Sequence, residues 1–256
     1  MACRRVTDRL RQDAFLGGRL RLWQPEKGYR AGVDPVILAA SVPARPGQSL
    51  LDLGCGAGAA MLCLGARVPG VALAGLDLQE GFVDLARRNA EENGIAAEVH
   101  RGDLAEMPAA LRAQRFDHVI ANPPYFDRAD GKASADPARE TAMGEATPLS
   151  DWVAAAVRRC APKGYVSVIH RAERLPELLA LMAARLGAVQ VLPLIPRAGR
   201  PARLVLIRGR MGSRAPFRLH DGLVMHDGPT HMADRQNYTP ALIAILRDGS
   251  GLGFPV

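Results

Sequence analysis

The 256-residue chain contains little cysteine and no long apolar segment. Its four cysteines, at positions 3, 55, 63 and 160, have neither the paired spacing of a zinc site nor the density of a disulfide framework. No run reaches the roughly eighteen uncharged apolar residues of a membrane span. Because Met1 to Arg5 are not followed by an uninterrupted apolar segment, a secretory signal is not indicated either. These absences predict a soluble protein of the reducing cytoplasm.

Lysine is also scarce, so nearly all of the positive charge is arginine; the lysines are Lys27, Lys132 and Lys163. The 33 basic residues exceed the 26 acidic ones, and the formal charge of +7 predicts a surface that attracts polyanions. Guanidinium groups suit phosphate particularly well, because they donate two parallel hydrogen bonds. A basic but inert surface is the alternative interpretation. The six histidines show no metal-ligand spacing on a shared helix, so no metal site is expected.

The apolar pattern predicts one large α/β domain. From Ser49 onward, short apolar runs alternate with segments of helical period, which is typical of βα units and a parallel sheet. The predicted strands are residues 49–53, 71–76, 97–101, 116–121, 164–169, 188–193 and 202–208. The predicted helices are residues 58–66, 80–92, 104–112, 149–160 and 173–185. About eight residues join the last two strands, too few for a crossover helix, so we expect an antiparallel last strand pair in a mostly parallel, seven-stranded sheet with helices on both faces.

Residues 1–48 are expected to form a short extension packed on the main domain, residues 49–256. The alternation of apolar and basic residues between Leu16 and Trp23 predicts a small hairpin over the sheet. Asp34 can cap, and Pro35 can begin, a helix that ends near Ala40.

A glycine-rich turn follows the first predicted strand of the main domain. Asp52 and the backbone of Gly54, Gly56 and Gly58 are expected to line a hollow at the carboxyl end of this strand, where open α/β sheets bind ligands. Such turns also use glycine for purely steric reasons. Asp77 strengthens the interpretation because it ends the next apolar run, nineteen residues after Gly58, where a carboxylate can accept both hydroxyl hydrogens of a ribose. The turn therefore predicts a site for a nucleotide-like cofactor.

Asp103 follows the third strand and has two interpretations. Its carboxylate can meet the exocyclic amine of a bound adenine, or it can cap the predicted helix 104–112. The pattern Asp-x-Gly-x-Gly-x-Gly differs from the Gly-x-Gly-x-x-Gly of NAD sites, so we expect a different adenosine cofactor.

The segment Asn122-Pro123-Pro124-Tyr125, at the end of the fourth strand, is the most specific signal. The exocyclic amine of adenine is a poor nucleophile, because its lone pair is delocalised into the ring. Two acceptors aimed at its N–H groups, the Asn122 side-chain oxygen and the Pro123 carbonyl, can make that lone pair available. Tyr125, together with Phe126, offers a ring face on which an extruded base can stack. The alternative is a proline turn with a buried tyrosine.

These residues resemble the class I S-adenosylmethionine-dependent methyltransferases, with residues 51–58 as the glycine motif and residues 122–125 as the catalytic motif of amino-group methylases. With Gly32-Val33-Asp34, Asp151-Trp152 and Asn237-Tyr238-Thr239, the layout is most similar to the bacterial enzymes that methylate N6 of adenine 37 in a valine tRNA. The resemblance implies a Rossmann-like fold and S-adenosylmethionine as cofactor. It implies cofactor contacts from Asp34, Asp52, Gly54, Gly56, Gly58, Asp77, Asp103 and Asn122, and catalysis by Asn122, Pro123 and Tyr125. For Asp34, helix capping explains its presence equally well.

Three other functions fit parts of the pattern. Release-factor glutamine methyltransferases share Asn-Pro-Pro-Tyr but resemble longer chains with a preceding helical domain. Guanine-N2 methyltransferases of ribosomal RNA usually have phenylalanine after the prolines and often a duplicated domain. An RNA chaperone that binds the cofactor without catalysis is the third, and the intact residues 122–125 argue against it.

Arginine is concentrated near both ends of the chain, at positions 4, 5, 9, 11, 19, 21 and 30 and at positions 197, 200, 203, 208, 210, 214 and 218. If both ends lie beside the catalytic motif, they form a track for a tRNA backbone; a solvated basic face is the alternative. The residues expected to contact the RNA are Pro124, Tyr125, Phe126, Arg139, Arg197 and Arg200. The polar segment 126–148 is either a loop that closes over the RNA or an inert connection. A monomer is expected.

Overall fold

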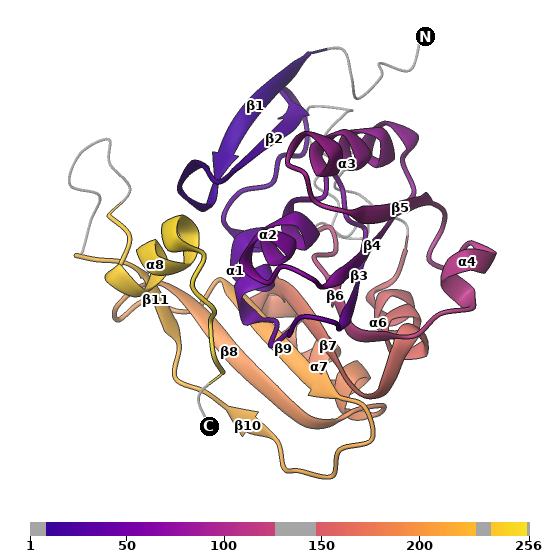
Figure 1. The fold of residues 1–256 in the computed structure, drawn as a ribbon. Helices are drawn as coiled ribbons and strands as arrows, with labels where there is room; N and C mark the ends of the chain where they lie inside the picture. The colour runs from indigo at the N-terminus through magenta and orange to yellow at the C-terminus, as the bar shows by residue number, and fades with distance from the viewer. Residues whose placement is uncertain (1–8, 126–146, 229–236, 255–256) are drawn as a thin grey trace, which may run out of the picture.

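The computed structural model describes residues 9–125, 147–228 and 237–254, and a twisted central sheet dominates them (Figure 1). Its strand order is β10-β8-β9-β7-β6-β3-β4-β5, and β11 also pairs with β8. The parallel strands are β3 (Ser49–Leu53), β4 (Ala72–Asp77), β5 (Ala97–Arg101), β6 (Phe116–Ala121) and β7 (Cys160–Arg171). Between β7 and β8 (Gly187–Arg197), β9 (Leu204–Arg210) runs antiparallel to both. The predicted α/β fold with its antiparallel last pair is confirmed.

The sheet has more strands than expected. Within the described residues it contains nine, because β10 (Arg218–Leu219) and β11 (Leu223–His226) add to β8. Both are too short to carry a readable alternation of apolar and polar residues, and their pairing with a preformed strand decides that they are extended. The prediction of seven strands was wrong for this reason.

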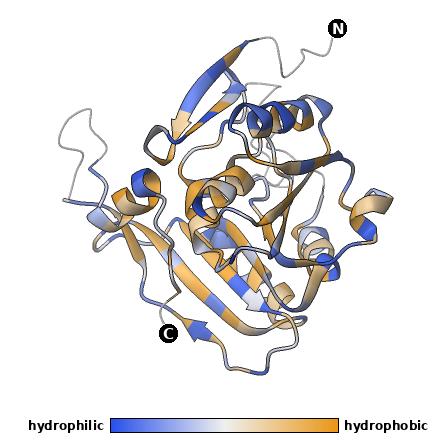
Figure 2. Cartoon of the chain, viewed as in Figure 1, coloured by the Kyte–Doolittle hydropathy of each residue, from blue (hydrophilic) through white to orange (hydrophobic). Residues whose placement is uncertain are grey.

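Helices cover both faces of the sheet, because the strands are apolar on both sides. Leu50 packs into one hydrophobic cluster, while Leu51 and Leu53 pack into the cluster on the opposite face. One face is covered by α1 (Asp34–Ser41), α2 (Ala59–Arg67), α3 (Glu80–Glu92) and α8 (Pro240–Asp248). The other is covered by α4 (Ala109–Arg112), α6 (Leu149–Arg159) and α7 (Leu175–Ala183). The apolar strands and the polar outer side of α3 are visible in Figure 2.

The predicted hairpin exists, but its strands lie elsewhere: β1 (Leu10–Phe15) and β2 (Leu20–Pro25) flank the short 3-10 helix η1 (Leu16–Gly18). The free edge of β2 is paired by two asparagines, Asn89 in α3 and Asn93 at its C-cap. Asn89 Oδ1 accepts from the Trp23 amide at 2.7 Å, and Asn93 Oδ1 accepts from the Arg21 amide at 3.0 Å. These bonds attach the hairpin to the sheet domain.

The structure corrects the helices in three places. The predicted helix 104–112 shrinks to α4, which begins after Pro108, because the residue before a proline disfavours the helical conformation. The helix α8 was missed, although Thr239 caps it by accepting from the Leu242 amide at 3.4 Å and Gly249, with φ +63°, ends it. At α1, Val33 is the N-cap and Asp34 the first helical residue, so the predicted capping role of Asp34 is wrong.

The described cysteines, Cys55, Cys63 and Cys160, are free and buried. In the part of the chain that the structure describes, each helix is too short or too polar to cross a bilayer.

Candidate active site

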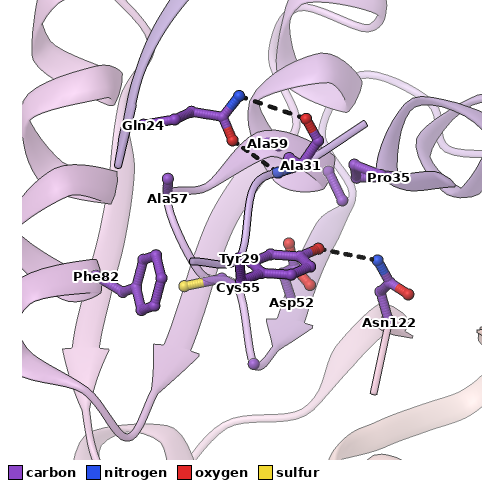
Figure 3. Close-up of a pocket in the computed structure, with 12 residues that line it drawn as sticks. Gln24, Tyr29, Ala31, Pro35, Asp52, Cys55, Ala57, Ala59, Phe82 and Asn122 are labelled. Atoms are coloured by element: carbon purple, nitrogen blue, oxygen red, sulfur yellow. Dashed lines mark hydrogen bonds between the residues drawn. The ribbon is translucent and has the colours of Figure 1, made fainter. Parts of the chain in front are cut away.

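The glycine turn and the Asn-Pro-Pro-Tyr segment meet at one edge of the sheet. Strand β3 lies between β4 and β6 and runs parallel to both. The carboxyl ends of the three strands therefore lie at the same edge of the sheet. Ligands of open α/β sheets bind at the carboxyl ends of such strands. A hollow lies at this point, and Tyr29, Asp52, Gly54, Phe82 and Asn122 are among the residues that line it (Figure 3).

The three glycines of the turn have positive φ angles but different surroundings. A Cβ on Gly54 would lie 2.5 Å from Cη2 of Trp152, and one on Gly58 would lie 3.0 Å from Cε of Met61. A Cβ on Gly56 would meet only the Tyr29 ring, at 3.8 Å. Gly54 and Gly58 are therefore required by packing as well as by the turn. Packing does not explain Gly56 in the same way, and its contact with a cofactor stays a prediction.

Two buried carboxylates hold this turn in place. Asp52 Oδ2 accepts from the Met61 amide at 3.3 Å, and burial, followed by the charge of Asp77, raises the pKa of Asp52 to about 8. Asp77 accepts from the Gly56 amide at 2.9 Å and from the Gln79 amide at 2.9 Å. Burial also raises the pKa of Asp77. Each carboxylate oxygen of Asp77 keeps a lone pair that can accept from a ligand. Its contact with a ribose stays a prediction.

Asn122, which lines the hollow, carries an unpaired acceptor on the side of its amide that faces away from Tyr29 (Figure 3). Its Nδ2 donates to the Tyr29 hydroxyl at 3.4 Å, whereas its Oδ1 is buried and has no hydrogen-bond partner among the described residues. A buried amide oxygen without a partner costs stability, and such atoms occur where a ligand is bound. This is the predicted position for an acceptor that faces a substrate amine.

Tyr29 is a site residue that the sequence did not reveal. Its ring lies in the hollow between the glycine turn and Asn122 (Figure 3) and leaves a cavity of about 20 Å³. Burial, followed by the charges of nearby aspartates, raises the pKa of Tyr29. The signal available in the sequence was an aromatic residue between Gly28 and Gly32, just before a helix.

Tyr125 is held at both ends of its side chain. Its hydroxyl donates to Asp34 Oδ2 at 2.8 Å, and its ring packs edge-on against His170, with centroids 5.4 Å apart and planes 67° apart. Burial raises the pKa of Tyr125 and of Asp34, and for Asp34 the hydrogen bond from Tyr125 opposes that rise. The structure thus gives Asp34 a partner within the catalytic motif; its predicted cofactor contact stays a prediction.

The remaining predicted residues are spread more widely. Asp103 is exposed and accepts from the Ala105 amide at 2.8 Å, so it caps a turn and not the predicted helix. Arg197 is buried, and its Nη1 donates to the carbonyls of Asp227 and Gly228. These bonds give Arg197 a structural role that the sequence did not indicate, whereas Arg200 is exposed in the β8–β9 turn. Phe126 and Arg139 lie outside the described residues.

The family of the chain follows from comparison with known proteins. The model of the methyltransferase small domain family matches residues 32–190. The chain belongs to this family. The match includes the glycine turn, Asp77, Asp103 and the Asn122–Tyr125 segment, so this methyltransferase carries its predicted site within the family domain. Within residues 9–125, 147–228 and 237–254, no cluster of three or more His, Cys, Asp or Glu side chains is arranged to hold a metal.

Two similar proteins are named tRNA1(Val) (adenine(37)-N6)-methyltransferase. The protein of Cronobacter sakazakii is 29% identical over 185 residues, which cover 71% of this chain and 72% of the relative. The protein of Yersinia pestis is 28% identical over 237 residues, which cover 86% of both chains.

Solved structures confirm the class I methyltransferase fold. A protein of Agrobacterium tumefaciens described as a predicted O-methyltransferase has a TM-score of 0.69 and 26% identity, with 87% of this methyltransferase and 100% of that chain covered. The 16S rRNA N2 G1207 methyltransferase of T. thermophilus, solved with AdoMet and guanosine, has a TM-score of 0.53 and 21% identity, with 79% of this chain and 50% of that chain covered.

Proposed function

We propose that this methyltransferase transfers a methyl group from S-adenosylmethionine to the exocyclic N6 of an adenine in tRNA, with adenine 37 of a valine tRNA as the expected site. The observation that carries the proposal is the buried, unpartnered Oδ1 of Asn122 beside the hollow of the glycine turn. The names of the two relatives support the same substrate. The proposed partner is cytoplasmic tRNA.

The residues around the hollow suit this cofactor in their chemistry. Gly56 leaves backbone open to a ligand, Phe82 offers an apolar ring, and Asp77 offers acceptors for hydroxyl groups. The cavity itself is too small for the cofactor, because its volume of about 20 Å³ is far below the roughly 300–1,000 Å³ of a small-molecule site. The ring of Tyr29 occupies part of this space. Tyr29 lies in the irregular segment between β2 and α1, and we propose that its ring leaves the hollow when the cofactor binds.

The chemistry requires the protein to prepare a weak nucleophile. When bound, the cofactor supplies an electrophilic methyl group on a sulfonium. The Asn122 side-chain oxygen and the Pro123 carbonyl accept the two N6 hydrogens of adenine, which shifts the nitrogen lone pair out of the ring. The cofactor, held beside the glycine turn and Asp77, would supply its methyl group to this nitrogen and leave as the neutral thioether, and the N6 proton would pass to water.

Asn122→Ala tests this assignment. With an unmodified valine tRNA transcript and isotope-labelled cofactor, the wild-type protein should place label on N6 of adenine 37, read by nucleoside mass spectrometry. Asn122→Ala should lose turnover by roughly a hundredfold or more while its cofactor affinity stays within about twofold, because the lost interaction forms only in the transition state. Asn122→Asp keeps acceptor oxygens and should retain measurable turnover.

Other outcomes of the same experiment would refute the proposal. Label on guanine N2, or on a release-factor glutamine offered in parallel, would exclude adenine as the acceptor. Binding of tRNA and cofactor without any product would favour the chaperone. An equal fall in cofactor affinity for Asn122→Ala would make Asn122 a cofactor ligand and not the activating group.

A further inference from the structure

We infer that Asp34 and His170 are positioning residues that hold Tyr125 of the catalytic segment in the orientation needed for methyl transfer. The inference rests on the proposed function for its readout. Neither residue belongs to the Asn-Pro-Pro-Tyr segment, and the two come from different elements: Asp34 begins α1, and His170 lies in β7.

The first contact is the hydrogen bond from the Tyr125 hydroxyl to Asp34 Oδ2, at 2.8 Å. It joins residues 91 positions apart in the sequence, so it ties the loop after β6 to the helix that precedes β3. A hydroxyl that donates to a carboxylate forms a charge-assisted bond, which is stronger than a bond between neutral groups. Because Asp34 does not cap α1, its carboxylate is free for this role.

The second contact comes from His170, which is 2% exposed. Burial, followed by the charge of Arg174, lowers the pKa of His170 to about 4, so the ring is neutral at physiological pH and carries a single N–H. Its Nδ1 has no hydrogen-bond partner among the described residues. The contact that His170 makes with the segment is through its ring, which packs edge-on against the Tyr125 ring with centroids 5.4 Å apart.

Together these contacts restrain one short segment from two sides. Tyr125 is held through its hydroxyl by Asp34 and through its ring by His170. Asn122 and Pro123, which carry the two proposed acceptors, lie only three and two residues before this restrained tyrosine. Groups that act on a transition state must be held to a fraction of an ångström, and residues that fix their rotamers supply that precision.

A double-mutant cycle between Asp34 and Tyr125 tests the first contact. Asp34→Ala and Tyr125→Phe each remove it, and each should lower kcat on tRNA by roughly tenfold, with the double variant no worse than the singles. The cofactor KM should stay within about twofold in all three. Asp34→Asn keeps an acceptor oxygen and should recover most of the lost kcat. Matched controls away from the site are Tyr165→Phe and Asp84→Ala, whose side chains lie on β7 and on the exposed side of α3.

His170 is tested by one variant that removes its ring and one that keeps an aromatic edge. His170→Ala removes the ring contact with Tyr125 and should lower kcat with the cofactor KM unchanged, whereas His170→Phe retains an aromatic edge and should keep most of the activity. Full activity of His170→Ala would overturn the role of His170.

Two results would overturn the role of Asp34. A rise in cofactor KM for Asp34→Ala that Tyr125→Phe does not share would make Asp34 a direct cofactor ligand. Additive losses of kcat would mean that the two residues act separately. The same cycle measured by urea unfolding detects the bond without any substrate. Absence of methyl transfer by the wild-type protein would therefore count against the proposed function, whereas absence of coupling in unfolding would count against this inference alone.

Discussion

Replacing Gly54 with alanine should destabilise the protein far more than the same change at Gly56, although both glycines belong to one turn. At Gly54 the new Cβ would lie 2.5 Å from Cη2 and 2.9 Å from Cζ3 of Trp152, at a φ of +65°. The left-handed backbone costs an L-residue roughly 1–2 kcal/mol. Forcing a buried ring to move costs roughly 1–3 kcal/mol more. The expected loss is about 2–5 kcal/mol, a large part of the 5–15 kcal/mol by which domains are stable.

At Gly56 the backbone cost is similar, but the nearest atom to the new Cβ is 3.8 Å away, on the Tyr29 ring. Gly56→Ala should therefore cost about 1–2 kcal/mol in unfolding and should weaken cofactor binding, because its Cβ faces the ring of Tyr29, which lines the hollow. Urea unfolding followed by circular dichroism measures the first quantity, and titration calorimetry measures the second.

Trp152→Phe provides the control for this reasoning. The smaller ring leaves room for the alanine Cβ, so adding Trp152→Phe to Gly54→Ala should cost less than Trp152→Phe costs in the wild-type protein. The steric argument is refuted if the two changes are additive, or if Gly54→Ala is no more destabilising than Gly56→Ala.

Three further predictions concern single side chains. Burial raises the pKa of Asp52 to about 8. Its protonated form therefore favours folding at low pH, and this contribution to stability, at most roughly 5 kcal/mol, is lost as the pH rises from about 4 to about 8. Asp52→Asn should flatten the dependence of Tm on pH, and an unchanged slope would contradict this. Arg197→Met should lower Tm, because it removes the donor to two backbone carbonyls, and it should leave the salt dependence of tRNA binding unchanged. Arg200→Met should make that salt dependence shallower. A shallower salt dependence for Arg197→Met would show that Arg197 does reach the RNA. Thr239→Ala removes the cap of α8 and should cost about 1 kcal/mol in urea unfolding, whereas Thr239→Ser should be nearly neutral.

Strong local patterns predicted much of the sheet and its cover. The bounds of β3, β5, β6 and α3 coincide with the predicted ones. β3 and β6 are apolar along most of their length, and α3 has a clear helical period. Shorter elements escaped prediction. The two-residue β10 and the four-residue β11 are extended because β8 offers them a partner.

The meeting of the glycine turn with Asn122 also followed from the chain alone. Parallel strands present their carboxyl ends at one edge of a sheet, so motifs that end two such strands must lie close together. Residue types at fixed positions after predicted strands were enough to identify the family and the kind of chemistry.

The partners of those motifs were decided by the tertiary structure. Tyr29 fills the hollow, Trp152 packs on Gly54, and Asp34 receives the hydroxyl of Tyr125. Arg197, one of many arginines in the sequence, proves to be buried and bonded to backbone. Local periodicity indicates which residues face a core and where strands end. It does not indicate which side chains from distant segments come into contact. Those contacts exist only once the sheet has brought the segments together.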